Sequence, residues 1–265
     1  MSTLVSENIT DSPLLVEHTA GITRLTLNRP KQFNALSNSM LEALQQGIDS
    51  LPDSTRVVVI RARGRAFCAG HDLKEMRAHP EQAYYQALFN RCSHFMQSLI
   101  ALPMPVIAEV QGIATAAGCQ LVANCDLAIA STDARFAVSG INMGLFCSTP
   151  SVALSRNVSR KRAFEMLMTG DFISARTAAG WGLVNRAVAP EELESAVADF
   201  CKTIIDKSSV AVSTGKSLFY EQLDMPLDDA YTLAGAKMAC NMMSNDVGEG
   251  IDAFMQKRKP EWTHS

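Results

Sequence analysis

The chain has 265 residues, of which 47% are hydrophobic, and a formal net charge of −3. This length suits one large α/β domain, or one domain with a small helical appendage, and the charge excludes the basic footprint of a nucleic-acid-binding protein. No apolar run approaches the roughly 20 residues that a membrane span needs. Seven cysteines, an odd number without framework spacing, predict reduced thiols in the cytoplasm.

The N-terminal segment shows no targeting pattern. Its first fifteen residues contain Glu7 and Asp11 but no Arg or Lys, whereas signal and transit peptides carry basic residues. Residues 1–12 are therefore expected to be a disordered lead-in. Alternating apolar residues over 14–18 and 22–27 predict a β-hairpin around a turn at residues 20–21.

Helical patterns begin soon after this hairpin. Ser39, with Glu42 three residues later, predicts a capping box for a helix whose apolar stripe includes Leu41, Leu44 and Ile48. A second helix is expected over residues 80–102.

Two short buried strands are each followed by small residues. Residues 57–60 precede the segment Phe-Cys-Ala-Gly-His-Asp-Leu-Lys at 67–74. Residues 106–110 precede a turn of small residues from Gly112 to Gly118, which opens an alanine-rich helical pattern through Leu121 and Cys125. A helix that begins at such a turn leaves backbone N–H groups free where its dipole favours negative charge. These turns either pack closely or each direct one N–H group at a carbonyl oxygen.

The rest of the chain is mainly helical in pattern. Residues 127–130 predict a further strand, residues 136–149 are irregular, and Pro150 suits the first turn of a helix capped by Thr149. From residue 160 onward helices dominate, including one with Leu193 and Val197 on its buried face. Strand–helix alternation followed by helices predicts an α/β fold of repeated ββα units with a helical C-terminal segment.

Several motifs together resemble the crotonase (enoyl-CoA hydratase/isomerase) superfamily. They are residues 28–30 (Asn-Arg-Pro), 34–36 (Asn-Ala-Leu), 67–74, 105–112 (Pro-Val-Ile-Ala-Glu-Val-Gln-Gly), 118–130, 167–170 (Leu-Met-Thr-Gly), 173–175, 179–184 and 249–254. The match covers nearly the whole chain in the expected order. It implies the crotonase (ClpP/crotonase-like) fold, with a core domain over 1–200 and a helical trimerisation segment over 201–265. The implied assembly is a homotrimer or a dimer of trimers.

The resemblance also implies a chemistry, the stabilisation of a thioester enolate by two backbone N–H groups. Motif by motif, these donors fall on His71 and on Ala117, where most members have glycine. No tightly bound cofactor is implied, because coenzyme A enters as part of the acyl-CoA substrate. The coenzyme A contacts that the resemblance implies fall on Lys31, Ala69, His71, Asp72, Leu73, Lys74, Ala117, Phe254 and Lys257, although Lys257 could equally belong to a solvated tail.

Two departures from the family pattern bear on the reaction. The two glutamates that move a proton in family hydratases fall on Gln120 and Gly140, and neither can act as a carboxylate. We therefore expect an enzyme that forms an enolate without efficient hydration. The pattern at residues 71–72 and 142–144 is also similar to the methylmalonyl-CoA decarboxylase branch, although Cys147 stands where that branch has tyrosine. The remaining alternative is a protein that binds acyl-CoA without turnover.

Other reactive residues receive structural interpretations. Cys147 is expected to be a buried thiol rather than a nucleophile, and His71 is expected to contribute its N–H group rather than its ring. Residues 214–217 (Thr-Gly-Lys-Ser) imitate a phosphate-binding loop but lack its first glycine. His71, Asp72 and Glu75 could be metal ligands, but solvated charges at a helix start are the favoured interpretation. The five histidines and seven cysteines show no zinc spacing.

Overall fold

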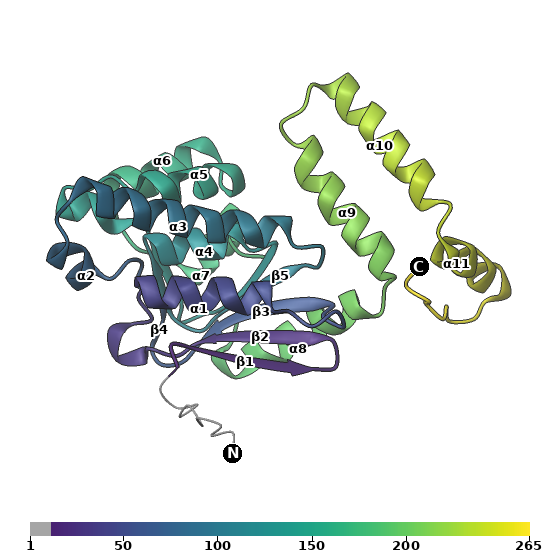
Figure 1. Cartoon of the computed structure of the whole chain (residues 1–265), viewed down its shortest axis with the longest axis horizontal. Coiled ribbons are helices and arrows are strands. Elements are labelled where there is room, and N and C mark those ends of the chain that lie inside the picture. Colours follow the sequence, from purple (N-terminus) through teal and green to yellow (C-terminus); the bar gives the residue numbers. More distant parts are fainter. Residues whose placement is uncertain (1–11) are drawn as a thin grey trace, which may run out of the picture.

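A computed structural model describes residues 12–265, so that all of the expected lead-in but its last residue lies outside the described part of the chain (Figure 1). Its strands form two sheets. The larger sheet has the order β1-β2-β3-β5-β7-β10, with β1 at Leu14–Thr19, β2 at Ile22–Leu27, β3 at Val57–Ala62, β5 at Val106–Val110, β7 at Leu127–Ser131 and β10 at Arg186–Val188. The smaller sheet has the order β4-β6-β8-β9, with β4 at Ala66–Cys68, β6 at Ile113–Thr115, β8 at Arg135–Ala137 and β9 at Ile173–Ser174. The predicted hairpin is confirmed as the antiparallel pair β1–β2.

Three successive strand pairs contribute to both sheets. In β3–β4, β5–β6 and β7–β8 the first strand enters the larger sheet and the second enters the smaller one, and neighbouring strands are parallel in both. This is the predicted repeated ββα architecture, and the fold class is confirmed. The sequence pattern missed β4, β6 and β8, because a strand of three residues is too short to show a two-residue period.

Eleven α-helices are found among residues 12–265. They are α1 (Asn38–Asp49), α2 (Leu73–Ala78), α3 (Gln82–Ala101), α4 (Ala117–Asn124), α5 (Ser148–Asn157), α6 (Arg160–Thr169), α7 (Ala175–Trp181), α8 (Leu193–Ile205), α9 (Ser209–Gln222), α10 (Leu227–Asn241) and α11 (Asn245–Gln256). Within the same residues, three 3-10 helices, η2 (Pro30–Gln32), η3 (Ser139–Met143) and η4 (Pro190–Glu192), lie in the connections.

Two predicted helix caps are wrong. Ser37, not Ser39, caps α1, because its hydroxyl accepts a hydrogen bond from the Met40 N–H group at 3.2 Å. Helix α5 begins at Ser148, so Cys147 holds the capping position that was expected for Thr149. The first error arises because Ser37 and Ser39 are near neighbours and only the path of the chain selects the one that caps. The second arises because α5 begins two residues before Pro150, at a position where no side chain makes a capping hydrogen bond.

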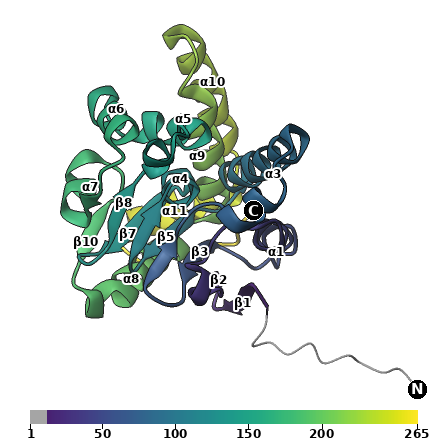
Figure 2. The ribbon, with the colours of Figure 1, turned by 90° about the vertical axis from the view of Figure 1, so that its left-hand side faces the viewer.

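The larger sheet is covered on both faces. Val58 and Ile60 of β3 pack into the main core with α1, α3 and α4, whereas Val57 and Val59 pack against α8. Figure 2 shows the sheet between these layers. A parallel strand buried on both sides needs apolar residues at every position, which accounts for the unbroken run Val-Val-Val-Ile.

The C-terminal helices α9 to α11 project from this core (Figure 1). Helix α9 is fastened to it by Lys216, only 9% exposed, whose ammonium donates to the carbonyls of Leu99 and Met104 and pairs with Asp126 at 2.7 Å. Tyr220 also donates to Asp126, at 2.7 Å. Lys216, from the segment that resembles a phosphate-binding loop, therefore anchors α9 to the core and does not bind a nucleotide in this arrangement. Residue 200, the predicted domain boundary, falls inside α8.

Candidate active site

The conformation of the turn after β4 is fixed by hydrogen bonds from neighbouring segments. Gly70 has a φ of +88°, a conformation that favours glycine. The N–H of Leu36 donates to its carbonyl at 2.7 Å, and the hydroxyl of Thr115 donates to the carbonyl of Ala69 at 3.0 Å. Buried Asn34 fixes the facing loop by donating to the carbonyl of Ala66 at 2.8 Å. The backbone leading to residue 71 is therefore preorganised.

The second turn joins β6 to α4. Ala116 has a φ of +48°, and its N–H group donates to the carbonyl of Ala137 at 3.0 Å. Helix α4 starts at Ala117, whose N–H group has no acceptor within the helix. A methyl group on Gly118 would overlap the carbonyl oxygen of Cys68, so α4 approaches β4 as closely as backbone allows.

The two turns meet. An ideal Cβ on Gly70 would lie 3.2 Å from the nitrogen of Ala117 and 3.0 Å from the Cβ of Ala116. His71, which follows Gly70, and Ala117 both line one cavity of about 460 Å³. The two turns that the sequence analysis singled out are therefore adjacent in the fold and border the same cavity.

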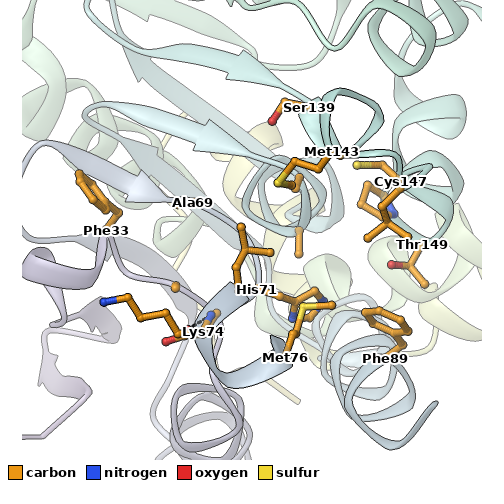
Figure 3. A pocket seen from close by; sticks show the side chains of 18 of the residues that line it. Phe33, Ala69, His71, Lys74, Met76, Phe89, Ser139, Met143, Cys147 and Thr149 are labelled. Atoms are coloured by element: carbon orange, nitrogen blue, oxygen red, sulfur yellow. Dashed lines mark hydrogen bonds between the residues drawn. The ribbon is translucent and has the colours of Figure 1, made fainter. Parts of the chain in front are cut away.

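The cavity is walled by segments far apart in the sequence (Figure 3). His71, Lys74, Met76 and Phe89 come from one side, and Met143, Cys147 and Thr149 come from another. The lining consists of Lys31, Gln32, Phe33, Ala35, Ala69, His71, Asp72, Leu73, Lys74, Met76, Phe89, Ala116, Ala117, Ser139, Gly140, Met143, Leu145, Phe146, Cys147, Ser148, Thr149 and Pro150. Most of these side chains are apolar or small, as in sites for organic ligands.

Most residues proposed from the sequence lie in this lining, namely Lys31, Ala69, His71, Asp72, Leu73, Lys74, Ala117 and Gly140. Gln120 is buried in α4 and is not part of it. Phe254, 85% exposed on α11, borders a separate hollow beside Trp262, and Lys257 follows that helix. The apolar wall formed by Phe33, Met76, Phe89 and Met143 was missed, because single apolar residues in loops and helices carry no signal for a cavity.

The ring of His71 is held as a neutral imidazole. Its Nδ1 lies 3.2 Å from the carbonyl oxygen of Leu36, so Nδ1 carries the proton and donates it. Nε2 is buried without a hydrogen-bond partner among the described residues. Burial lowers the pKa of this ring, outweighing the Leu36 carbonyl and the charge of Glu75. Because the unperturbed value is 6.5, the ring is uncharged at pH 7.

The neighbouring carboxylates are already engaged. Asp72 caps α2 by accepting from the N–H groups of Lys74 and Glu75 at 2.9 and 3.1 Å. Glu75 accepts from the backbone and side chain of Asn38. Residues 12–265 contain no group of three or more His, Cys, Asp or Glu side chains arranged to hold a metal ion.

The space beside Gly140 is occupied by neighbouring atoms. A Cβ on Gly140 would lie 2.6 Å from the carbonyl oxygen of Leu145 and 2.8 Å from the sulfur of Cys147. Cys147 is buried, and burial raises the pKa of its thiol, although the backbone of Gly140 acts in the opposite direction. The thiol is therefore protonated at neutral pH, as expected for a structural cysteine.

Two sheets built from ββα units, with two turns meeting at an apolar cavity, define a protein of the crotonase fold. The family model described as enoyl-CoA hydratase/isomerase matches residues 17–265, and the chain belongs to this family. No described helix is both long and apolar enough to cross a bilayer.

Named relatives agree with this assignment. Enoyl-CoA hydratase domain-containing protein 3, mitochondrial, from Xenopus laevis is 48% identical, over 98% of this chain and 90% of that protein. A crystal structure of enoyl-CoA hydratase from Mycobacterium smegmatis is 58% identical with a TM-score of 0.93, covering 94% of this chain and 98% of that one. The crystal structure of human enoyl Coenzyme A hydratase domain-containing protein 3 is 45% identical with a TM-score of 0.92, covering 94% and 100%.

The predicted cytoplasmic location is contradicted. Five relatives that are 44–48% identical to the chain are each named mitochondrial. The prediction rested on reduced thiols, and six of the seven cysteines are indeed buried and free. Buried thiols remain reduced in any reducing compartment, so they could not distinguish one compartment from another.

Proposed function

We propose that this chain binds an acyl-CoA thioester in the cavity and stabilises its enolate through the N–H groups of His71 and Ala117. The observation that carries the proposal is the meeting of the two turns, with the Cβ position of Gly70 3.2 Å from the Ala117 nitrogen. Both donors border the same cavity. Two fixed N–H groups in an apolar wall stabilise an oxygen that gains negative charge, and each is worth about 10²–10³ in rate.

Helix α4 strengthens this arrangement. Ala117 is its first residue, so the free N–H group coincides with the positive end of the helix dipole. Ala117 itself is buried, so the donor acts where water screens it little. When the enolate forms, a thioester oxygen placed here changes from a neutral carbonyl oxygen to a charged enolate oxygen. The helix dipole stabilises the charged form more than the neutral one.

Efficient hydration is not part of the proposed function. Addition of water needs a group that takes and returns a proton near neutral pH. Gln120 carries an amide, which does not titrate there, and Gly140 has no side chain. The sulfur of Cys147 and the carbonyl of Leu145 occupy the space from which a side chain at residue 140 would start.

Coenzyme A contacts are proposed for the rim of the cavity. Lys31 and Lys74 are exposed there and can meet the phosphates. Phe254 and Lys257 lie on and after α11, outside the cavity, and are proposed to act on a neighbouring copy in a homotrimer or a dimer of trimers. This assembly is supported by large apolar side chains exposed along the C-terminal helices, namely Phe219, Leu223, Leu227, Tyr231, Met238, Met242, Met243, Phe254 and Met255.

The test is incubation of the whole protein with acyl-CoA thioesters in deuterated water, followed by mass spectrometry. The panel contains butyryl-CoA, crotonyl-CoA and methylmalonyl-CoA. We expect slow deuterium incorporation at the α-carbon of butyryl-CoA, with the solvent taking the α-proton that enolate stabilisation makes more acidic, and little hydration of crotonyl-CoA. Ala117→Pro removes one donor at the first helical position, where proline is tolerated, and should slow the exchange about 10²-fold.

A matched proline variant serves as the control. Arg160→Pro changes the first residue of α6, which does not line the cavity, and should exchange at the wild-type rate. Wild-type exchange in Ala117→Pro would refute the oxyanion assignment. Loss of carbon dioxide from methylmalonyl-CoA would identify a decarboxylase instead, and binding without any mass change would identify a protein that only holds acyl-CoA.

A further inference from the structure

Thr115 ends strand β6, immediately before the turn that carries the proposed Ala117 donor. The parallel pairing of β6 with β4 ends at Ala114 and Cys68. Beyond this pair the two chains leave the ladder, one toward His71 and the other toward Ala117. The separation of the two proposed donors is therefore not set by a backbone ladder, and other contacts have to fix it.

The hydroxyl of Thr115 makes such a contact. It donates to the carbonyl of Ala69 at 3.0 Å, and Thr115 is only 9% exposed. That carbonyl lies one peptide before the His71 N–H group, and Thr115 lies two residues before Ala117. One side-chain hydrogen bond thus joins the turn after β4 directly to the turn before α4.

The backbone hydrogen bonds of these turns lead elsewhere. The N–H group of Ala69 donates to the carbonyl of Phe33 at 3.0 Å, and the carbonyl of Gly70 accepts from the N–H group of Leu36 at 2.7 Å. Both bonds attach the first turn to the loop before α1. In the second turn, the N–H group of Ala116 donates to a carbonyl of β8. These bonds hold each turn against its own neighbours, but they do not link the two turns to each other.

Packing and the hydroxyl act in opposite directions on the two turns. An ideal Cβ on Gly70 would lie 3.1 Å from the backbone oxygen of Thr115 and 3.2 Å from the nitrogen of Ala117, so the turns are already in close contact. Close packing resists a shorter separation. The hydrogen bond from the hydroxyl to the Ala69 carbonyl resists a longer one.

A contribution to stability does not by itself explain the hydroxyl. Valine is β-branched like threonine, favours strands and would bury no polar group at this position. The net gain from one hydrogen bond is modest, because it replaces bonds to water. The relative placement of two donors, in contrast, decides how well both reach one oxygen, and small displacements in such sites reduce rates strongly.

We propose that Thr115 is a positioning residue that holds the His71 and Ala117 N–H groups at the separation at which both bond one enolate oxygen. It acts through the Ala69 carbonyl and does not line the cavity. The inference rests on the proposed function, because it concerns the spacing of the same two donors.

The first test compares the exchange of the α-protons of saturating butyryl-CoA in deuterated water. Thr115→Val keeps the β-branched shape but removes the donor to Ala69. We expect exchange to fall about 10-fold, because a displacement of about 1 Å can cost about 10²-fold and a smaller one is expected here. Thr115→Ser keeps the hydroxyl and should stay within about 3-fold of the wild type. The dissociation constant of butyryl-CoA should change by less than about 3-fold, because the donors stabilise the enolate more than the carbonyl.

Thr55→Val is the matched control. Thr55 is 3% exposed, shares a hydrogen bond of 2.9 Å with the hydroxyl of Thr23 and lies outside the cavity lining. Its substitution removes a buried hydroxyl of the same kind, so it should lower the urea midpoint about as much as Thr115→Val does. It should leave the exchange rate unchanged. Thr115→Ala answers the same question if the Thr115→Val protein folds poorly.

Infrared spectroscopy observes the effect of the donors on the bound thioester. Butyryl-CoA that is isotopically labelled at its thioester carbonyl gives a separate C=O stretching band, which hydrogen bonds shift to lower frequency. The wild-type protein should lower this frequency relative to free butyryl-CoA. Thr115→Val should return it part of the way, whereas Thr115→Ser and Thr55→Val should keep the wild-type value.

Each contrary result has a separate meaning. Wild-type exchange with an unchanged carbonyl band in Thr115→Val overturns the inference and leaves the proposed function standing. An equal loss of exchange in Thr55→Val also overturns it, because the effect is then one of general stability. A loss in Thr115→Ser as large as in Thr115→Val assigns the effect to packing and not to the hydroxyl. If the wild type binds butyryl-CoA without exchange and without a shifted band, the proposed function fails as well.

Discussion

Gly140 provides the sharpest test of the proposal that this chain hydrates enoyl thioesters poorly. Its Cβ position lies 2.6 Å from the Leu145 carbonyl oxygen and 2.8 Å from the Cys147 sulfur, and real Cβ atoms essentially never approach closer than 3.0 Å. An alanine here must displace the backbone by a few tenths of an ångström as well as the thiol. Overpacking of this kind costs about 1–3 kcal/mol. We therefore expect Gly140→Ala to lower the free energy of unfolding by that amount.

Urea denaturation measures this loss. The control is Gly180→Ala on α7, where a Cβ meets nothing within 4 Å and alanine should add about 0.5–1 kcal/mol through helix propensity. Removing the sulfur in a Gly140→Ala, Cys147→Ala double variant should recover part of the loss, because the two side chains compete for one space. The part caused by the Leu145 carbonyl should remain.

The functional consequence is tested by restoring both carboxylates. Gln120→Glu with Gly140→Glu should hydrate crotonyl-CoA poorly, as followed by the absorbance of the enoyl thioester, because residue 140 cannot place a side chain without moving its neighbours. A Gly140→Ala variant as stable as the wild type would refute the steric argument. Rapid hydration by the double glutamate variant would refute it independently.

Three other substitutions test the backbone donors of the two turns, the imidazole of His71 and the anchoring of α9 by Lys216. Gly118→Ala should reduce α-proton exchange about 10²-fold, because its methyl overlaps the Cys68 carbonyl and shifts α4 relative to the first turn; unchanged exchange would show that the turns tolerate the shift. The stability that neutral His71 contributes should be complete above pH 6.5 and be lost as the pH falls through the lowered pKa of the folded protein. In His71→Gln, the free energy of unfolding should therefore fall less steeply toward acid pH, by up to about 1.4 kcal/mol per pH unit. The same substitution at exposed His94 should leave this slope unchanged. Lys216→Met should cost about 3 kcal/mol in thermal or urea unfolding, because it leaves a partly buried carboxylate without its cation; a loss below 1 kcal/mol would mean that this anchoring is dispensable.

The sequence alone determined the larger part of the fold. Apolar runs over residues 57–60, 106–110 and 127–130 predicted three central strands, because a parallel strand covered on both faces needs apolar residues at every position. The spacing of Leu193 and Val197 predicted α8 for a related reason, since one helical stripe must face the sheet. The prediction that Gln120 and Gly140 cannot act as carboxylates also needed only the sequence, because it depends on residue type and not on position in space.

Only the tertiary structure decided how these residues meet. The contact of Gly70 with Ala117 joins residues 47 positions apart, and Lys216 contacts Asp126 and Leu99 across 90 and 117 positions. The sulfur of Cys147 lies in the space of the absent side chain at Gly140, seven positions away across a loop. Such contacts follow from how strands and helices stack, and a one-dimensional pattern records periodicity but not adjacency. The residue types therefore fixed which chemistry is available, and packing fixed which groups can take part in it.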